Sequence, residues 1–214
     1  MTADVPRAIL GVVLAGGLSR RMGRDKAALP LGGIPLAIRA LERLRPQVTS
    51  LAFNGAPAFP GLSPDIEAIP DAVPGAFGPL AGVLAGLRLG QSRNIPLVVS
   101  VPVDAPFFPH VFVRRLLSAL EETNSVIAVA ASGDTLHPVF ALWSSSLADD
   151  LKRFIETDAK RRVRGFIEQH AHVVVDFTAT GDACGDIDPF MNMNRPGDVE
   201  MIERMLSCAG TAKL

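Results

Sequence analysis

The sequence predicts an α/β fold in three layers, with a mostly parallel central sheet between helices. Two observations predict this fold. Apolar, β-branched segments alternate along the chain with helical patterns, and this order of elements is typical of α/β layered folds. The first apolar segment, residues 8–14, leads directly into Ala15-Gly16-Gly17. A buried strand that ends in a glycine turn is typical of a parallel sheet.

The remaining elements are predicted from the same patterns. Further buried strands are expected at residues 49–54, 96–103, 126–130, 139–142 and 173–177. Helices are expected at residues 35–44, 79–89, 111–122, 147–155, 161–169 and 196–206, the last with Pro196 in its first turn. Ligands of open α/β sheets collect beyond the carboxyl ends of the strands. The strand ends at Gly16, Asn54 and Asp104 therefore mark the predicted ligand site.

The composition is that of one folded domain, which we place at residues 1–214. Hydrophobic residues make up 48% of the chain and charged residues 20%, so the chain can bury a substantial core. The net charge is only -1, but basic residues gather at 20–26 and at 160–164. Two local anion sites fit this distribution better than a nucleic-acid surface, which usually shows domain-wide basicity. For the second cluster, an ordinary basic helix face is an equal alternative.

No segment predicts export or membrane insertion. The apolar run at 9–18 lacks the charge pattern and cleavage site of a signal peptide. The uncharged stretch 72–87 is too short and too interrupted by glycine and proline to span a bilayer. Cys184 and Cys208 are too few and too far apart for a zinc cluster. We therefore expect a cytoplasmic protein with neither a membrane nor a nucleic-acid partner.

The strongest functional signal is the loop after the first strand, which reads LAGGLSRRMGRDK from Leu14 to Lys26. Glycines let backbone N–H groups approach an anion closely, and arginine and lysine neutralise its charge. This combination suits a triphosphate, although a structural loop with incidental basic residues is the alternative. The loop matches neither G-x-x-x-x-G-K-[ST] nor G-x-G-x-x-G, which disfavours kinases, P-loop GTPases and dehydrogenases.

With these residues the sequence resembles the molybdenum cofactor guanylyltransferases, whose first strand is followed by a similar L-A-G-G-x-S-x-R-M-G-x-x-K loop. The resemblance covers nearly the whole chain in order and implies a Rossmann-like nucleotidyltransferase fold. It continues through Phe53-Asn54, Ile69-Pro70-Asp71, Gly78-Pro79-Leu80-Ala81-Gly82, Pro102-Val103-Asp104-Ala105-Pro106, His137-Pro138-Val139-Phe140-Ala141-Leu142 and Asn192-Met193-Asn194.

The resemblance assigns a role to Asp104, Asn54 and Asp71. Asp104 follows a predicted strand and precedes Ala105-Pro106, and by resemblance it binds Mg2+, a cation that prefers oxygen ligands. The alternative is a turn carboxylate that caps the helix near Pro109. Asn54 and Asp71 match positions that contact the guanosine of GTP, whereas Asp71 without the resemblance would be read as a turn residue.

Glycines and asparagines provide the other positions implied by the resemblance. Gly78, Gly82 and Gly86 recur every fourth residue on one helix face, which close packing on the sheet would explain. By resemblance, the segment from Gly78 to Gly82 also lines the base pocket, where the absence of side chains leaves room for a purine. Asn192 and Asn194 are placed in the crevice near the pterin, while Asn194 could instead cap the next helix. His137 and the basic run with Lys160, Arg161 and Arg162 would face the pterin and its phosphate.

The function implied is transfer of GMP from GTP to the phosphate of molybdopterin, with release of pyrophosphate and with Mg2+ as cofactor. The N-terminal half would bind nucleotide and the C-terminal half the pterin; molybdenum-insertion proteins and molybdoenzyme chaperones are further expected partners. The expected catalytic residues are Arg21, Lys26 and Asp104, and the expected binding residues are Leu14, Ala15, Gly16, Gly17, Lys26, Asn54, Asp71, Gly78, Gly82, Asp104, Asn192 and Asn194. The alternatives are a cytidylyltransferase of the same fold, acting on molybdopterin or a sugar alcohol phosphate, and a non-catalytic GTP-binding module.

Overall fold

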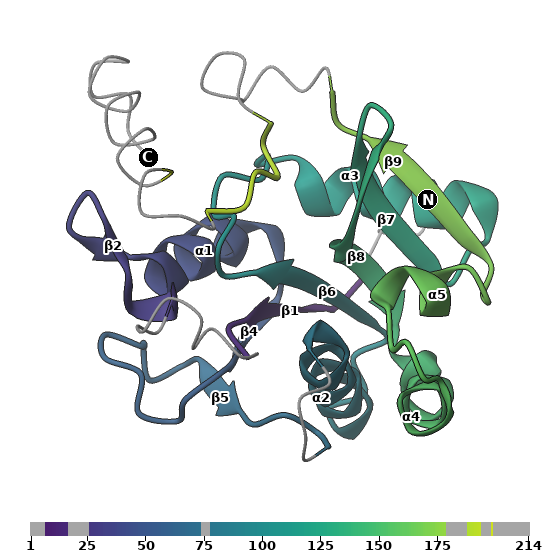
Figure 1. The fold of residues 1–214 in the computed structure, drawn as a ribbon, viewed down its shortest axis with the longest axis horizontal. Coiled ribbons are helices and arrows are strands. Elements are labelled where there is room, and N and C mark those ends of the chain that lie inside the picture. The colour runs from purple at the N-terminus through teal and green to yellow at the C-terminus, as the bar shows by residue number, and fades with distance from the viewer. Residues whose placement is uncertain (1–6, 17–25, 74–77, 179–187, 194–197, 199–214) are drawn as a thin grey trace, which may run out of the picture.

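The computed structural model describes residues 7–16, 26–73, 78–178, 188–193 and 198 of the chain (Figure 1). The predicted helix at 196–206 lies outside these residues, apart from Asp198.

Within the described residues, seven strands form one sheet in the order β5-β4-β1-β6-β8-β7-β9. Strand β8 runs antiparallel to β6 and β7, and all other neighbours are parallel, so the predicted mostly parallel sheet is confirmed. The strands are β1 (Ile9–Leu14), β4 (Ser50–Asn54), β5 (Glu67–Ile69), β6 (Leu97–Pro102), β7 (Ile127–Ser132), β8 (Thr135–Ser144) and β9 (His172–Asp176).

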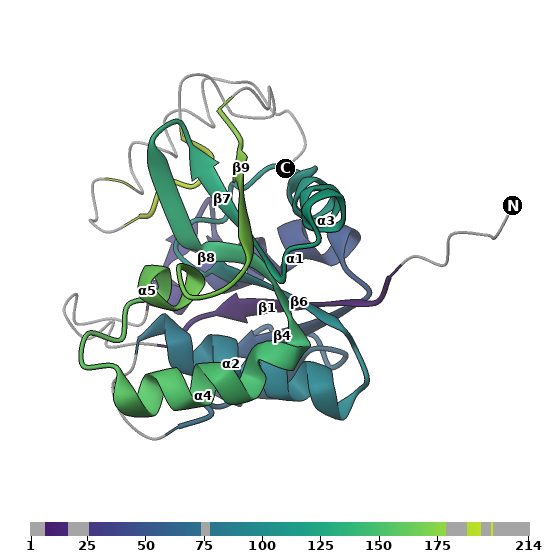
Figure 2. The same cartoon turned by 90° about the vertical axis from the view of Figure 1, so that its right-hand side faces the viewer.

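Helices cover both faces of this sheet, which gives the expected three layers (Figure 2). Strand β1 shows why: Ile9 and Val13 pack into a core with α1 and α3, whereas Leu10, Val12 and Leu14 pack into the core with α2 and α4 on the other face. None of the described helices has the length and apolar character that crossing a membrane requires. The helices are α1 (Leu36–Leu44), α2 (Pro79–Ser92), α3 (Phe112–Thr123), α4 (Ala148–Thr157) and α5 (Val163–Ile167), with 3-10 turns η2 (Lys26–Ala28), η3 (Arg45–Gln47) and η4 (Ser145–Leu147).

The predicted elements have bounds that differ by one to a few residues from those in the structure, and three short strands were not predicted. β8 begins at Thr135 rather than at 139, because its first residues pair with β7 across a two-residue turn. α5 begins at Val163 rather than at 161, because the backbone N–H groups of Lys160 and Arg161 bond to the Asp158 carboxylate. β5 and the small hairpin of β2 (Pro30–Leu31) and β3 (Ile34–Pro35) are too short to show a period.

Glycines let α2 lie very close to the sheet. A Cβ atom at Gly82 would lie 2.9 Å from Leu14 Cδ2, and one at Gly86 would lie 2.8 Å from Val12 Cγ2. The packing explanation therefore holds for Gly82 and Gly86 and extends one turn further to Gly90, but it does not hold for Gly78, where no atom lies within 4 Å of a Cβ position.

A buried serine connects β6 with β8 through hydrogen bonds. The Trp143 indole N–H donates to Ser100 Oγ at 2.9 Å, and Ser100 Oγ donates to the Val139 carbonyl at 2.6 Å. Ser100 and Trp143 are both fully buried, so water cannot replace this serine as a partner.

We predict that Ser100→Ala lowers the free energy of unfolding by about 1–3 kcal/mol, because it leaves a buried N–H and a buried carbonyl without a partner. The measurement is chemical denaturation of the purified protein. Ser92→Ala, which removes an exposed hydroxyl that bonds to the Leu89 carbonyl, is the control and should change stability by less than about 0.5 kcal/mol. Equal stability of both variants would contradict the role of Ser100.

Candidate functional site

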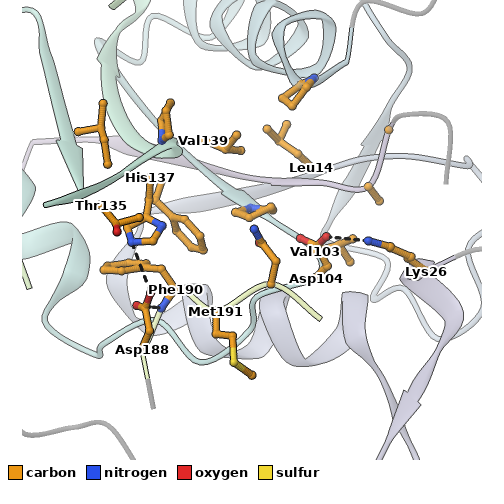
Figure 3. Close-up of a pocket in the computed structure, with 18 residues that line it drawn as sticks. Leu14, Lys26, Val103, Asp104, Thr135, His137, Val139, Asp188, Phe190 and Met191 are labelled. Carbon is orange, nitrogen blue, oxygen red and sulfur yellow. Dashed lines mark hydrogen bonds and ion pairs between the residues drawn. The ribbon is translucent and has the colours of Figure 1, made fainter. Parts of the chain in front are cut away.

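A cavity of about 520 Å³ opens at the carboxyl ends of β1 and β6 (Figure 3). This is the edge where the sequence predicts the ligand site. The lining residues come from six parts of the chain: Leu14, Ala15 and Gly16; Lys26; Pro79; Pro102, Val103 and Asp104; Thr135, Leu136, His137, Pro138, Val139 and Phe140; and Asp188, Phe190, Met191 and Asn192.

Parallel pairing of the strands places the predicted residues of this edge beside one another. Leu14 lies opposite both Asn54 of β4 and Pro102 of β6. The pairing continues past the strand ends, because Ala15 N–H donates to the Asn54 carbonyl at 2.8 Å and Val103 N–H donates to the Leu14 carbonyl at 3.0 Å. The residues that follow β1 and the residues that precede Asp104 are thereby held side by side.

Lys26 and Asp104 form an ion pair in the cavity wall, 78 positions apart in sequence. Lys26 Nζ lies 3.1 Å from Asp104 Oδ2, and the side chains are only 15% and 19% exposed. Both groups were predicted, and the structure brings them together. In such a cavity, the partly desolvated ammonium of Lys26 can bind a phosphate, and the partly desolvated carboxylate of Asp104 can bind a metal ion.

The donor set fits magnesium but does not form a complete protein cage. Among the described residues, no group of three or more His, Cys, Asp or Glu side chains could hold a metal ion. Mg2+ is usually held by one or two carboxylates together with substrate phosphates and water. A single carboxylate, Asp104, beside a cationic Lys26 suits that arrangement.

Asn54 and Asp71 form a second polar group behind the β1 turn. Asn54 is buried, and its Nδ2 donates to the Ile69 carbonyl at 3.2 Å and to Asp71 Oδ1 at 3.1 Å. A Cβ atom at Gly16 would lie 2.9 Å from Asn54 Oδ1 and 3.0 Å from Asp71 Oδ1. Glycine at position 16 is therefore required for the β1 turn to pass these two side chains.

The two glycines expected to leave room for a purine differ in their surroundings. Gly78 has φ of +60° with no atom within 4 Å of a Cβ position, so backbone conformation favours glycine there. Gly82 does not line the cavity: a Cβ atom there would overlap Asn54 Oδ1 and lie 2.8 Å from Asn54 Cγ. In this structure the space at Gly82 is filled by the Asn54 side chain.

A bulge in β8 turns His137 into the cavity. Ala130 pairs with His137, but the preceding residue of β7, Val129, pairs with Ala141, so residues 138–140 have no partner in β7. Proline has no backbone N–H to offer the ladder, and such bulges re-aim side chains near active sites. Pro138 thus accounts for the position of His137, a predicted residue that the structure places in the wall.

Residues 188–193 form the wall opposite β1, and this segment is fixed at both ends. Met193 N–H donates to the Asp104 carbonyl at 2.8 Å. At the other end, Phe190 packs into an aromatic cluster, with ring centroids 4.7 Å from both His137 and Phe140. Asn192 therefore lines the cavity as predicted.

Sequence reasoning missed Asp188 and Phe190 in this wall. Asp188 Oδ2 lies 3.7 Å from His137 Nε2, and Asp188 Oδ1 accepts from the Phe190 N–H at 2.9 Å and from Ser132 Oγ at 3.1 Å. The sequence feature that could have identified these two residues is the segment Asp188-Pro189-Phe190, which lies just before Met191 and Asn192. Burial lowers the pKa of His137 below its ordinary value, and the charge of Asp188 partly opposes that shift.

Other predicted site residues are not brought to the cavity or lie outside the described residues. Lys160, Arg161 and Arg162 are exposed and do not line it. Arg161 Nε donates instead to the Ile155 carbonyl at 2.9 Å. Gly17, Arg21 and Asn194 lie outside the part of the chain that the structure describes, so their roles remain predictions.

Comparison with known proteins agrees with this geometry. The family model of the MobA-like NTP transferase domain matches residues 11–173. A protein of Rhizobium meliloti named molybdenum cofactor guanylyltransferase is 46% identical over 198 residues, 91% of this chain and 90% of its own length. A protein of the same name from Sinorhizobium fredii is 48% identical over 92% of this chain and 91% of its own length.

Solved structures show the same fold. Molybdopterin-guanine dinucleotide biosynthesis protein A from Archaeoglobus fulgidus aligns with a TM-score of 0.74 and 26% identity, over 94% of this chain and 99% of the other. The 2-C-methyl-D-erythritol 4-phosphate cytidylyltransferase of Thermus thermophilus aligns with a TM-score of 0.60 and 17% identity, over 92% and 98% of the two chains. The chain belongs to the MobA-like NTP transferase domain family.

Proposed function

We propose that this protein transfers GMP from GTP to the phosphate of molybdopterin and releases pyrophosphate. The observation that carries the proposal is the Lys26–Asp104 ion pair, which lies in the cavity at the strand ends in a chain of this nucleotidyltransferase family. Relatives named molybdenum cofactor guanylyltransferase support GTP as donor. The test is a turnover assay with molybdopterin and each nucleoside triphosphate, in which pyrophosphate release should require GTP. Equal use of CTP would favour a cytidylyltransferase, and GTP binding without turnover would favour a binding module.

The polar group of Asn54 and Asp71 is the proposed contact for the guanosine. Asp71 is exposed, while its Oδ1 already accepts from Asn54. A carboxylate can accept several hydrogen bonds, so Asp71 retains capacity for the N–H donors of guanine or for ribose hydroxyls. The N-terminal half of the chain thus contributes the nucleotide contacts, and residues 135–140 and 188–192 contribute the acceptor side of the cavity.

The proposed reaction needs no general base. A phosphate monoester has a second pKa of about 6, so its dianion dominates near neutral pH. One of its oxygens attacks the α-phosphorus of GTP in line and forms a new P–O bond. The bond from the α-phosphorus to the oxygen that bridges the β-phosphorus breaks, and pyrophosphate leaves with the electron pair.

Catalysis then consists of alignment and charge neutralisation. Lys26 is proposed to bind the outer phosphates, because its ammonium lies at the cavity wall with a carboxylate as partner. Arg21 is proposed to assist from the same loop. Asp104 would hold Mg2+, and bound Mg2+ would neutralise phosphate charge. We place this chemistry in the cytoplasm, with molybdenum-insertion proteins and molybdoenzyme chaperones as proposed partners.

Asp104→Asn should reduce turnover at least about 100-fold, because an amide is a poor ligand for Mg2+ and a poor partner for Lys26. The assay is pyrophosphate release at several Mg2+ concentrations. Asp65→Asn is the control, since Asp65 pairs with Arg45 on the exposed surface and should not change turnover. An Asp104→Asn protein with wild-type activity and magnesium dependence would rule out the metal role.

Lys26→Ala should weaken GTP binding about tenfold or more and GMP binding much less, because the ammonium is proposed to meet the outer phosphates. Calorimetric titration of each nucleotide measures the difference. Lys152→Ala, which removes an exposed lysine of α4 paired with Glu156, should affect neither nucleotide. If the Lys26 variant loses affinity for GTP and GMP equally, the side chain does not act on the outer phosphates.

Gly82→Ala should lower GTP affinity about tenfold, because the new methyl group displaces the Asn54 side chain from Asp71 and from the Ile69 carbonyl. Gly86→Ala is the matched control on the same helix face. Its methyl group meets Val12 rather than Asn54, so it should lower thermal stability without changing affinity. Similar GTP affinities in both variants would show that the Asn54 position does not matter for the nucleotide.

A further inference from the structure

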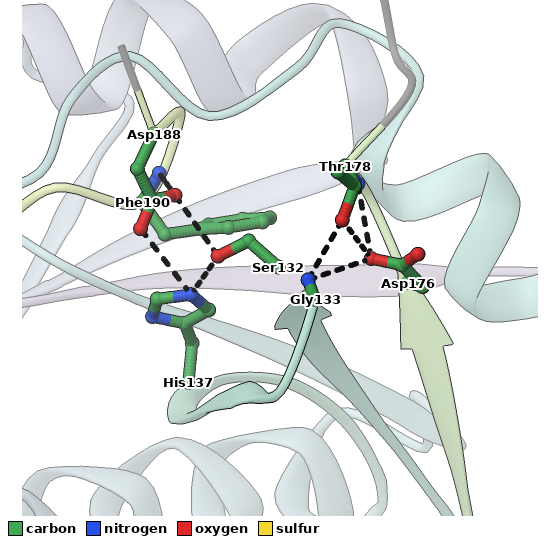
Figure 4. A network of polar contacts seen from close by, with 7 residues as sticks. All are labelled: Ser132, Gly133, His137, Asp176, Thr178, Asp188 and Phe190. Atoms are coloured by element: carbon green, nitrogen blue, oxygen red, sulfur yellow. Dashed lines mark hydrogen bonds and ion pairs between the residues drawn. The ribbon is translucent and has the colours of Figure 1, made fainter. Parts of the chain in front are cut away.

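Ser132, His137 and Asp188 form a hydrogen-bonded chain in the wall of the cavity (Figure 4). Ser132 Oγ lies 2.5 Å from His137 Nε2 and 3.1 Å from Asp188 Oδ1. His137 is 11% exposed and Asp188 40% exposed. Ser132 and His137 belong to the hairpin of β7 and β8, whereas Asp188 belongs to the wall segment 188–193, so these hydrogen bonds connect the hairpin with a segment that is distant in sequence.

The direction of each hydrogen bond in this chain follows from the groups involved. A carboxylate only accepts, and a serine hydroxyl has one hydrogen to donate. Ser132 therefore donates to Asp188 and must accept from His137, which places a hydrogen on Nε2. A neutral imidazole carries only one such hydrogen, so Nδ1 of His137 is left as an acceptor.

His137 Nδ1, the acceptor nitrogen, faces away from Ser132 and Asp188. Both partners lie at Nε2, and the other ring nitrogen points to the opposite side of the ring (Figure 4). Within the described part of the chain, no hydrogen bond to Nδ1 is found. The Phe190 ring packs against the imidazole with centroids 4.7 Å apart, which restricts rotation of His137, and His137 lines the cavity.

Burial disfavours the charged form of His137 and lowers its pKa, while Asp188, the acidic group that acts on it, raises that pKa by less. A neutral ring with an acceptor nitrogen repels a phosphate oxygen but accepts from an N–H group. The heterocyclic part of the acceptor substrate, rather than its phosphate, is therefore the suitable partner.

We propose that His137 is a specificity-determining residue whose Nδ1 accepts a hydrogen bond from an N–H group of the heterocycle in the acceptor substrate. Asp188 and Ser132 are positioning residues that fix the required tautomer. The proposal rests on the proposed function, since it concerns the second substrate of that reaction.

The test is Asp188→Ala, which removes the acceptor of the Ser132 hydroxyl hydrogen. Ser132 Oγ still lies 2.5 Å from His137 Nε2, so the hydroxyl can turn and donate to that nitrogen. The ring hydrogen then moves to Nδ1, because a neutral imidazole carries only one. Two donors would then face each other in the complex.

We expect the KM for molybdopterin to rise about tenfold or more, because a buried hydrogen bond is lost, while the KM for GTP is unchanged. Nitrogen-15 NMR of the imidazole rings should show the hydrogen moving from Nε2 to Nδ1 in His137, one of the chain's 4 histidines. His137→Leu identifies the signal. A purely structural role of Asp188 would not produce this tautomer change.

Asp176→Ala is the matched control. Asp176 accepts from the Gly133 and Thr178 N–H groups in the adjacent network and does not contact His137. It should leave the tautomer and both KM values unchanged. An unchanged KM for molybdopterin in Asp188→Ala, or a lower one, would overturn the proposal, as would a His137 hydrogen that stays on Nε2. If the wild-type protein turns over GTP with another acceptor but not with molybdopterin, the proposed function fails; the NMR result would still report separately on the tautomer.

Discussion

The site depends on the parallel pairing of β1 with strands on both of its sides. Because β4 and β6 run parallel to β1, all three carboxyl ends meet at one edge of the sheet. Asn54 and Asp104 are thereby brought to the turn after β1, although they are distant from it in sequence. The glycines of α2 support this arrangement by letting the helix lie against Leu14 and Val12.

The cavity combines two kinds of surface that suit two kinds of substrate. On the β1 side, the ion pair of Lys26 and Asp104 is shielded from water, so its charges act more strongly on phosphates than exposed ones would. On the other side, the β8 bulge and residues 188–193 supply aromatic rings and an imidazole whose burial lowers its pKa. A charged half beside an aromatic half fits a reaction that joins a nucleotide to a phosphorylated heterocycle.

Most of the fold could be predicted because local patterns were strong. The buried strands at Ile9–Leu14 and Ser50–Asn54 contain enough consecutive apolar residues to be recognised, and the helices α1 and α3 show clear apolar faces. β5 could not be predicted, because three residues, Glu67–Ile69, carry no readable period. The antiparallel direction of β8 was also not evident, since direction depends on which strands pair and not on composition.

The proposed phosphate-binding half could be predicted from the sequence, because Gly16, Lys26 and Asp104 follow or lie near strand ends and have the residue types that a triphosphate and its cation require. The reason for Gly82 and the role of Asp188 arise only in three dimensions. The space beside Gly82 is filled by the Asn54 side chain and is not open to a base. Asp188 lies near His137 because residues 188–193 pack across the edge of the sheet. Such contacts join residues far apart in the chain, so no local pattern can encode them.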